Sequence, residues 1–180
     1  QDPSPTRQDT WGKVSKLRHD LGLRSGDLSQ TGEFSAMLLE SLYENKGVYK
    51  QNDFTDRVNQ LLKQIDGTSM SGRFTDRAIR DLWKNRAAGI SWDEAGSDTD
   101  TGEAAIRAIS LVARNIDNQH QLVAEAYENI WLTHNNSYVA GQSLTYALAV
   151  EALIQGVPLS DIRTHMSQLG DDKYICDRTV

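Results

Sequence analysis

Helical periodicity runs through nearly the whole of this 180-residue chain and limits what it can fold into. Apolar residues recur at spacings of three and four, which mark one face of a helix, and they do not alternate as they do in a half-buried strand. Only three prolines interrupt this pattern. The sequence therefore predicts an all-α fold, and the chain length fits a single helical domain over residues 1–180.

One predicted helix, from Tyr138 to Ile154, differs from the others because it is apolar around most of its circumference. This is the pattern of a helix enclosed by neighbours, so we expect it at the centre of a bundle. At the chain ends we expect a loose arm over residues 1–10 and a polar tail that frays over residues 171–180. The other predicted helices span about 32–45, 53–65, 75–85, 104–116 and 119–134, with a short one after Pro158.

The charge pattern excludes several classes of partner. The formal net charge is −6, and acidic and basic residues are interspersed, which argues against nucleic acid or an anionic membrane surface as a partner. No apolar run approaches the roughly 20 residues of a membrane span. The single Cys176 has no partner for an internal disulfide, and no charged-then-apolar leader is visible. We therefore expect a cytoplasmic location.

Three polar motifs in a fixed order carry the functional information. Residues 28–34 read Leu-Ser-Gln-Thr-Gly-Glu-Phe and open a helix that continues through Leu-Glu-Ser-Leu at 39–42. Residues 96–107 read Gly-Ser-Asp-Thr-Asp-Thr-Gly-Glu-Ala-Ala-Ile-Arg, and residues 131–136 read Trp-Leu-Thr-His-Asn-Asn. Taken together, these motifs resemble the ADP-ribosylglycohydrolase family over roughly residues 26–156. The resemblance implies an orthogonal multi-helix bundle and hydrolysis of the glycosidic bond of ADP-ribosylated substrates.

The first motif aligns with the family's Thr-Asp-Asp-Thr-Gln, whose threonine and aspartates bind magnesium. Ser29, Gln30 and Thr31 fall on those ligand positions, so both carboxylates are replaced by neutral groups. A divalent cation favours several oxygen ligands with negative charge, and we therefore predict no metal ligands, with magnesium as cofactor only if the family activity is retained. In that case the resemblance implies Glu33, Gln30 and Thr31 as the catalytic residues.

The second motif aligns with a family loop whose backbone amides cradle the diphosphate of ADP-ribose at a helix start. The resemblance implies that Ser29, Thr99, Asp100, Thr101, Gly102 and His134 contact the substrate. Carboxylates stand here where the family has small residues, and they would repel a diphosphate. An alternative alignment treats Asp98, Asp100 and Thr101 as the family's second metal motif, but that motif belongs further along the chain and breaks the spacing to both flanking motifs.

His134 has two interpretations, because a histidine at a helix end commonly bonds a neighbouring carbonyl group, whereas family members place this histidine near bound ADP-ribose. The function likewise has alternatives. The chain is either a glycohydrolase acting on ADP-ribose or an ADP-ribosylated protein, or a catalytically inactive relative that serves as a binding, interaction or structural protein. In the last case we expect a protein partner or a missing second segment to cover an apolar face.

Overall fold

A computed structural model describes residues 28–64 and 76–179, and every regular element within these two ranges is a helix. The prediction of an all-α fold is confirmed, whereas the predicted arm over residues 1–10 lies outside the described residues. No helix in the described ranges is long and apolar enough to cross a membrane. The elements are α3 (Gln30–Glu44), α4 (Gln51–Leu62), α5 (Arg77–Ala87), α6 (Glu103–Arg114), α7 (Gln119–Trp131), α8 (Ser137–Ile154), the short 3₁₀ turn η1 (Leu159–Asp161), α9 (Ile162–Leu169) and α10 (Lys173–Thr179).

Side-chain caps set where four of these helices begin. Ser29, Asp76, Asn118 and Asn136 stand immediately before α3, α5, α7 and α8, and each side-chain oxygen accepts a hydrogen bond from a backbone N–H in the first turn. Such caps satisfy amides that have no partner within the helix, and each typically contributes about 1 kcal/mol. The observed starts of the helices lie within a few residues of the predicted ones.

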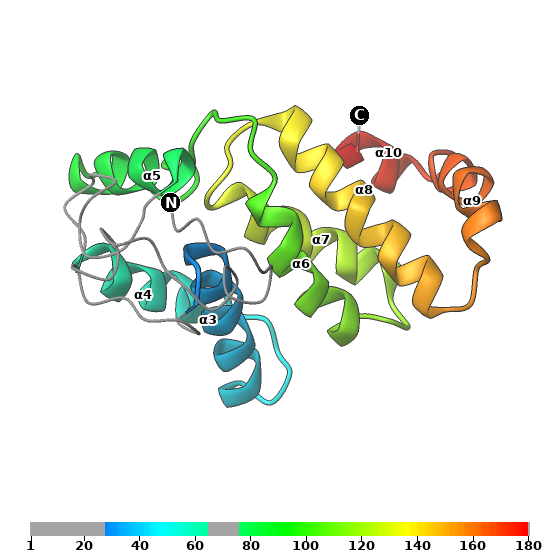
Figure 1. Ribbon diagram of the computed structural model, residues 1–180, viewed down its shortest axis with the longest axis horizontal. Coiled ribbons are helices and arrows are strands. Elements are labelled where there is room, and N and C mark those ends of the chain that lie inside the picture. Colours follow the sequence, from blue (N-terminus) through cyan, green and yellow to red (C-terminus); the bar gives the residue numbers. More distant parts are fainter. Residues whose placement is uncertain (1–27, 65–75, 180) are drawn as a thin grey trace, which may run out of the picture.

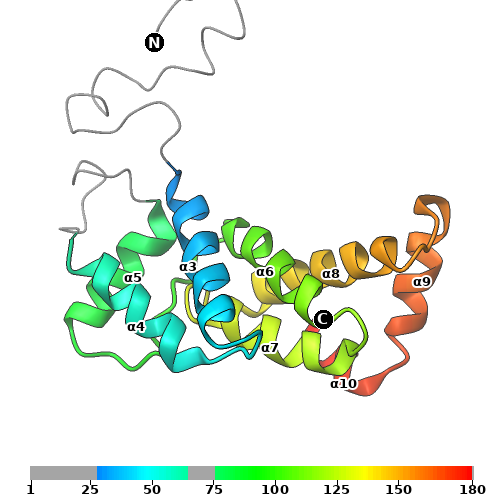
Figure 2. The ribbon, with the colours of Figure 1, turned by 90° about the horizontal axis from the view of Figure 1, so that it is seen from below.

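Helix α8 packs against α6, α7, α9 and α10, which confirms its predicted central place in this part of the bundle (Figures 1 and 2). Leu144 and Leu148 are completely buried on its inner side. The opposite side remains open, because Tyr146 is 47% exposed and Leu153 is 42% exposed. The apolar pattern of α8 predicts a helix enclosed on all sides, but among the described residues only one side of it is buried.

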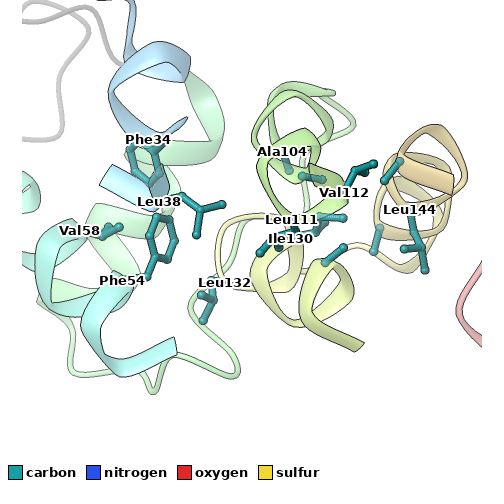
Figure 3. Packing of buried hydrophobic residues seen from close by; sticks show 14 of the residues in the cluster. Phe34, Leu38, Phe54, Val58, Ala104, Leu111, Val112, Ile130, Leu132 and Leu144 are labelled. Carbon is teal, nitrogen blue, oxygen red and sulfur yellow. The ribbon is translucent and has the colours of Figure 1, made fainter. Parts of the chain in front are cut away.

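The core is continuous but has two parts, which Figure 3 shows side by side. One part lies between α3 and α4, where the rings of Phe34 and Phe54 meet edge to face with centroids 6.5 Å apart. The other lies among α6, α7 and α8 and includes Leu111, Ile130 and Leu144. Helix α3 also packs directly on α6, so the beginnings of these two helices are held together.

The polar tail predicted over residues 171–180 is wrong for most of its length, because residues 173–179 form α10 and pack on α8 and α7. Ile175 is buried, and it anchors this short helix in the core. The Asp172 carboxylate accepts the N–H of Tyr174 at 2.8 Å. Gly141 on α8 makes room for α10, since a Cβ there would lie 2.9 Å from the carbonyl oxygen of Thr179. One buried residue and one glycine thus fix a segment that reads as polar.

Candidate functional site

The beginnings of α3, α5 and α6 converge on a small cavity, called here the junction cavity. Its volume is about 10 Å³, which is the room needed for a single water molecule. The α3–α4 part of the core reaches it, because Phe34 belongs to its wall. The lining residues are Gln30, Thr31, Phe34, Asp76, Ile79, Glu103, Arg107 and His134.

Gln30 and Asp76 join two of these helix starts directly. The backbone N–H of Asp76 donates to Oε1 of Gln30 at 2.9 Å. The Asp76 carboxylate accepts the N–H of Ile79 at 2.8 Å and thereby caps α5. Burial raises the pKa of Asp76, and this cap hydrogen bond acts in the opposite direction. The amide oxygen of Gln30, at a position where the family has an aspartate, therefore joins the start of α3 to the start of α5.

His134 is almost completely buried, and hydroxyl groups contact both of its ring nitrogens. Nδ1 lies 2.9 Å from Oγ1 of Thr133, and Nε2 lies 3.2 Å from Oγ1 of Thr101. Oε2 of Glu103 is 3.6 Å from Nε2, which is beyond hydrogen-bond length. Burial and the nearby Arg107 charge lower the pKa of His134 to about 4, although Glu103 acts in the opposite direction. The imidazole is therefore neutral at pH 7.

Arg107 is a buried cation without a carboxylate bonded to it among the described residues. Its Nε donates to Oδ1 of Asn129 at 2.6 Å, and its Nη2 donates to the Asn129 carbonyl at 2.7 Å and to Oγ1 of Thr133 at 2.6 Å. The guanidinium also lies over the rings of Phe34 and Phe54. Burial lowers the pKa of Arg107 to about 10. The group stays charged at pH 7, and neutral acceptors compensate it.

The predicted site residues separate into two groups. Gln30, Thr31 and His134 line the junction cavity, and Thr101 reaches it through its contact with His134. Glu33 instead lines a groove between α3 and α4. The reason is helical spacing, because Glu33 shares its face with Met37 and Glu40, whereas Gln30 shares its face with Phe34.

Four further predicted residues lie around the cavity without lining it. Ser29 is exposed, and its Oγ is used as the cap of α3. Thr99 is buried, its N–H bonds Oγ of Ser97, and its own Oγ1 has no partner in the described parts of the chain. Asp100 and Gly102 are exposed, and a Cβ on Gly102 would touch nothing within 4 Å.

The loop before α6 is held against the end of α7. The N–H of Ser97 donates to the carbonyl of Thr133 at 2.9 Å, and Gly96 passes so close that a Cβ there would lie 2.6 Å from the carbonyl oxygen of Trp131. Oδ1 of Asp98 accepts a hydrogen bond from Nδ2 of Asn136 at 2.9 Å. Asp98, a ligand in the alternative metal alignment, therefore ties this loop to the start of α8.

Three polar residues that line the cavity were not predicted as site residues, namely Asp76, Glu103 and Arg107. Glu103 and Arg107 belong to the second motif, at residues 96–107, whereas Asp76 lies outside all three motifs. Only the fold shows that Asp76, the cap of α5, lies beside the start of α6.

The described residues do not fit a magnesium site. Ser29 and Gln30 already accept backbone N–H groups, and Thr31 contributes a neutral oxygen. Within residues 28–64 and 76–179, no group of three or more histidine, cysteine or carboxylate side chains could hold a metal ion. Divalent cations favour several carboxylate oxygens, and of the two carboxylates that line this cavity, Asp76 already caps α5.

Comparison with protein families identifies the family to which the chain belongs. The ADP-ribosylglycohydrolase family model matches residues 3–178, which includes every motif described above. No curated protein and no solved structure matches the chain. Because the match covers nearly all of the sequence, the chain belongs to the ADP-ribosylglycohydrolase family.

Proposed function

We propose that this chain is ADP-ribosylglycohydrolase-like in its fold but works as a binding or structural protein rather than as a metal-assisted hydrolase. The observation that carries the proposal is the hydrogen bond from Asp76 N–H to Gln30 Oε1. This hydrogen bond uses the side chain of Gln30, a residue of the first motif, to join α3 to α5. In a metal-assisted hydrolase this position would supply charge to a cation.

Two further observations support the proposal. Ser29 caps α3, and Asp98 ties its loop to Asn136, so polar groups that the family motifs would direct at a ligand make internal contacts here. The junction cavity has room for about one water molecule and none for a ribose ring. The preserved polar residues thus stabilise the junction of three helices.

A second candidate is residual hydrolysis without a metal, and it rests on Glu103. Its Oε2 is buried, has no hydrogen-bond partner among the described residues and faces the neutral His134 at 3.6 Å. A carboxylate in this state could take a proton from a water molecule as the water oxygen bonds the anomeric carbon and the glycosidic bond breaks, and the carboxylic acid so formed then gives that proton to the leaving group. This route needs the cavity to open enough to admit a ribosyl group.

An assay on an ADP-ribosylated peptide separates the two. We expect no release of ADP-ribose above the uncatalysed rate, with or without millimolar magnesium. Release that a chelator abolishes would refute the proposal, because it requires a working metal site. Release that survives the chelator but is lost in Glu103→Gln would support the second candidate. The matched control is Glu94→Gln, since Glu94 is exposed and does not line the cavity.

A further inference from the structure

A second and larger cavity lies between the end of α8 and α9, at the other end of the molecule from α3 and α5 (Figure 1). Its volume is about 450 Å³, within the range of roughly 300–1,000 Å³ that small-molecule sites occupy. It shares no lining residue with the junction cavity. The residues around this α8–α9 cavity are Asp117, Gln119, Glu151, Ala152, Gln155, Val157, His165 and Leu169.

Glu151 is the unusual residue in this wall, because it is only 3% exposed and its carboxylate has no cationic partner in the described parts of the chain. Nε2 of Gln119 donates to one of its oxygens at 3.1 Å, and Nε2 of Gln155 donates to the other at 2.5 Å. Amide donors orient a carboxylate but do not neutralise it. A buried charge is commonly matched by an opposite charge. His165 is the one basic side chain among the described residues of the lining, and it forms no ion pair with Glu151.

The rest of the lining indicates which ligand would supply the positive charge. Asp117 adds a second, exposed carboxylate, and neither lysine nor arginine lines the cavity. Ala152, Val157 and Leu169 provide apolar surface between the polar groups. No cluster suited to a metal ion is present in the described residues, which favours an organic cation.

We propose that the α8–α9 cavity binds an alkylammonium ligand, with one ammonium group donating to Glu151 and the alkyl chain lying on the apolar wall. In a diamine, the second ammonium group pairs with Asp117. This site is independent of the junction cavity and of any activity there.

The test is a calorimetric titration of the full chain with 1,4-diaminobutane at low ionic strength, with 1,4-butanediol as the uncharged analogue. We expect binding of the diamine and none of the diol. Glu151→Gln should weaken binding about 10- to 100-fold, the loss expected for one hydrogen bond to a charged group. Equal heats from diamine and diol, or no diamine binding at millimolar concentration, would overturn the proposal.

Glu125→Gln is the matched control variant. Glu125 is also a buried carboxylate held by two amides, those of Asn115 and Gln121, but it does not line this cavity. It should leave diamine affinity unchanged, and equal weakening in both variants would refute the assignment. If Glu151→Gln fails to fold, the affinity of Asp117→Asn, a variant on the exposed rim, is measured in its place. Asp117→Asn should bind the diamine several-fold more weakly and bind 1-aminobutane with unchanged affinity. An unchanged affinity for the diamine would contradict the site.

Discussion

Removing the Asn129 side-chain amide should destabilise the fold strongly, because this amide compensates a buried charge. Arg107 is 3% exposed, and Oδ1 of Asn129 accepts its Nε–H at 2.6 Å. A hydrogen bond to a charged group contributes about 1.5–3 kcal/mol, and an unsatisfied buried donor adds its desolvation cost. For Asn129→Ala we therefore expect a loss of about 3 kcal/mol in the free energy of unfolding. In a domain of this size, that lowers Tm by about 6–12 °C.

A double-mutant cycle with Arg107→Met isolates the contribution of the charge. Methionine fills part of the space beside Phe34 and Phe54 but needs no acceptor. In that background, Asn129→Ala should cost only about 1 kcal/mol, so the coupling free energy is about 2 kcal/mol. Urea unfolding followed by circular dichroism measures all four proteins. A coupling below about 0.5 kcal/mol would show that Asn129 does not stabilise the cation and would refute the argument.

Three further predictions concern pH and close packing. The pKa of His134 is lowered in the folded state to about 4 from 6.5, so the unfolded chain binds the proton more readily. The free energy of unfolding should therefore fall by about 3 kcal/mol as pH drops from 6.5 to 4. In urea melts at a series of pH values, His134→Gln should remove this loss of stability. An unchanged slope would show that the imidazole is not the group responsible. Gly96→Ala should lower the free energy of unfolding by at least about 2 kcal/mol, because a Cβ there meets backbone atoms. Gly102→Ala should lower it by less than about 1 kcal/mol. Similar losses in thermal melts would contradict the close approach of the loop before α6 to the end of α7. Gly141→Ala should displace the carbonyl of Thr179 and speed amide hydrogen exchange in α10 specifically, and uniform protection would count against that packing.

Much of the fold could be predicted because it depends on local pattern. The three- and four-residue periodicity places α3 to α8 to within a few residues. The C-terminal segment could not be predicted in the same way. Helix α10 forms because Ile175 enters the core beside α8, and that contact spans a long stretch of sequence.

The candidate site was predictable only in part, because it is built from the ends of separate helices. Motif order places Gln30, Thr31 and His134 near one another, and the structure brings them to one cavity. The position of Glu33 follows from the direction in which α3 packs, and a helical wheel alone does not show which face meets α5. The contact between Gln30 and Asp76 likewise depends on how α5 docks against α3.

The central claim is that the side chains of the first motif make internal hydrogen bonds and do not bind a metal ion. Calorimetric titration of the purified chain with ADP-ribose, with and without several millimolar magnesium, tests this claim. Because Gln30 and Ser29 are committed to backbone N–H groups, we expect magnesium to change neither the heat nor the affinity. Magnesium-dependent binding that is at least tenfold tighter would contradict this account, since it requires a metal site at the motif that the described residues do not form.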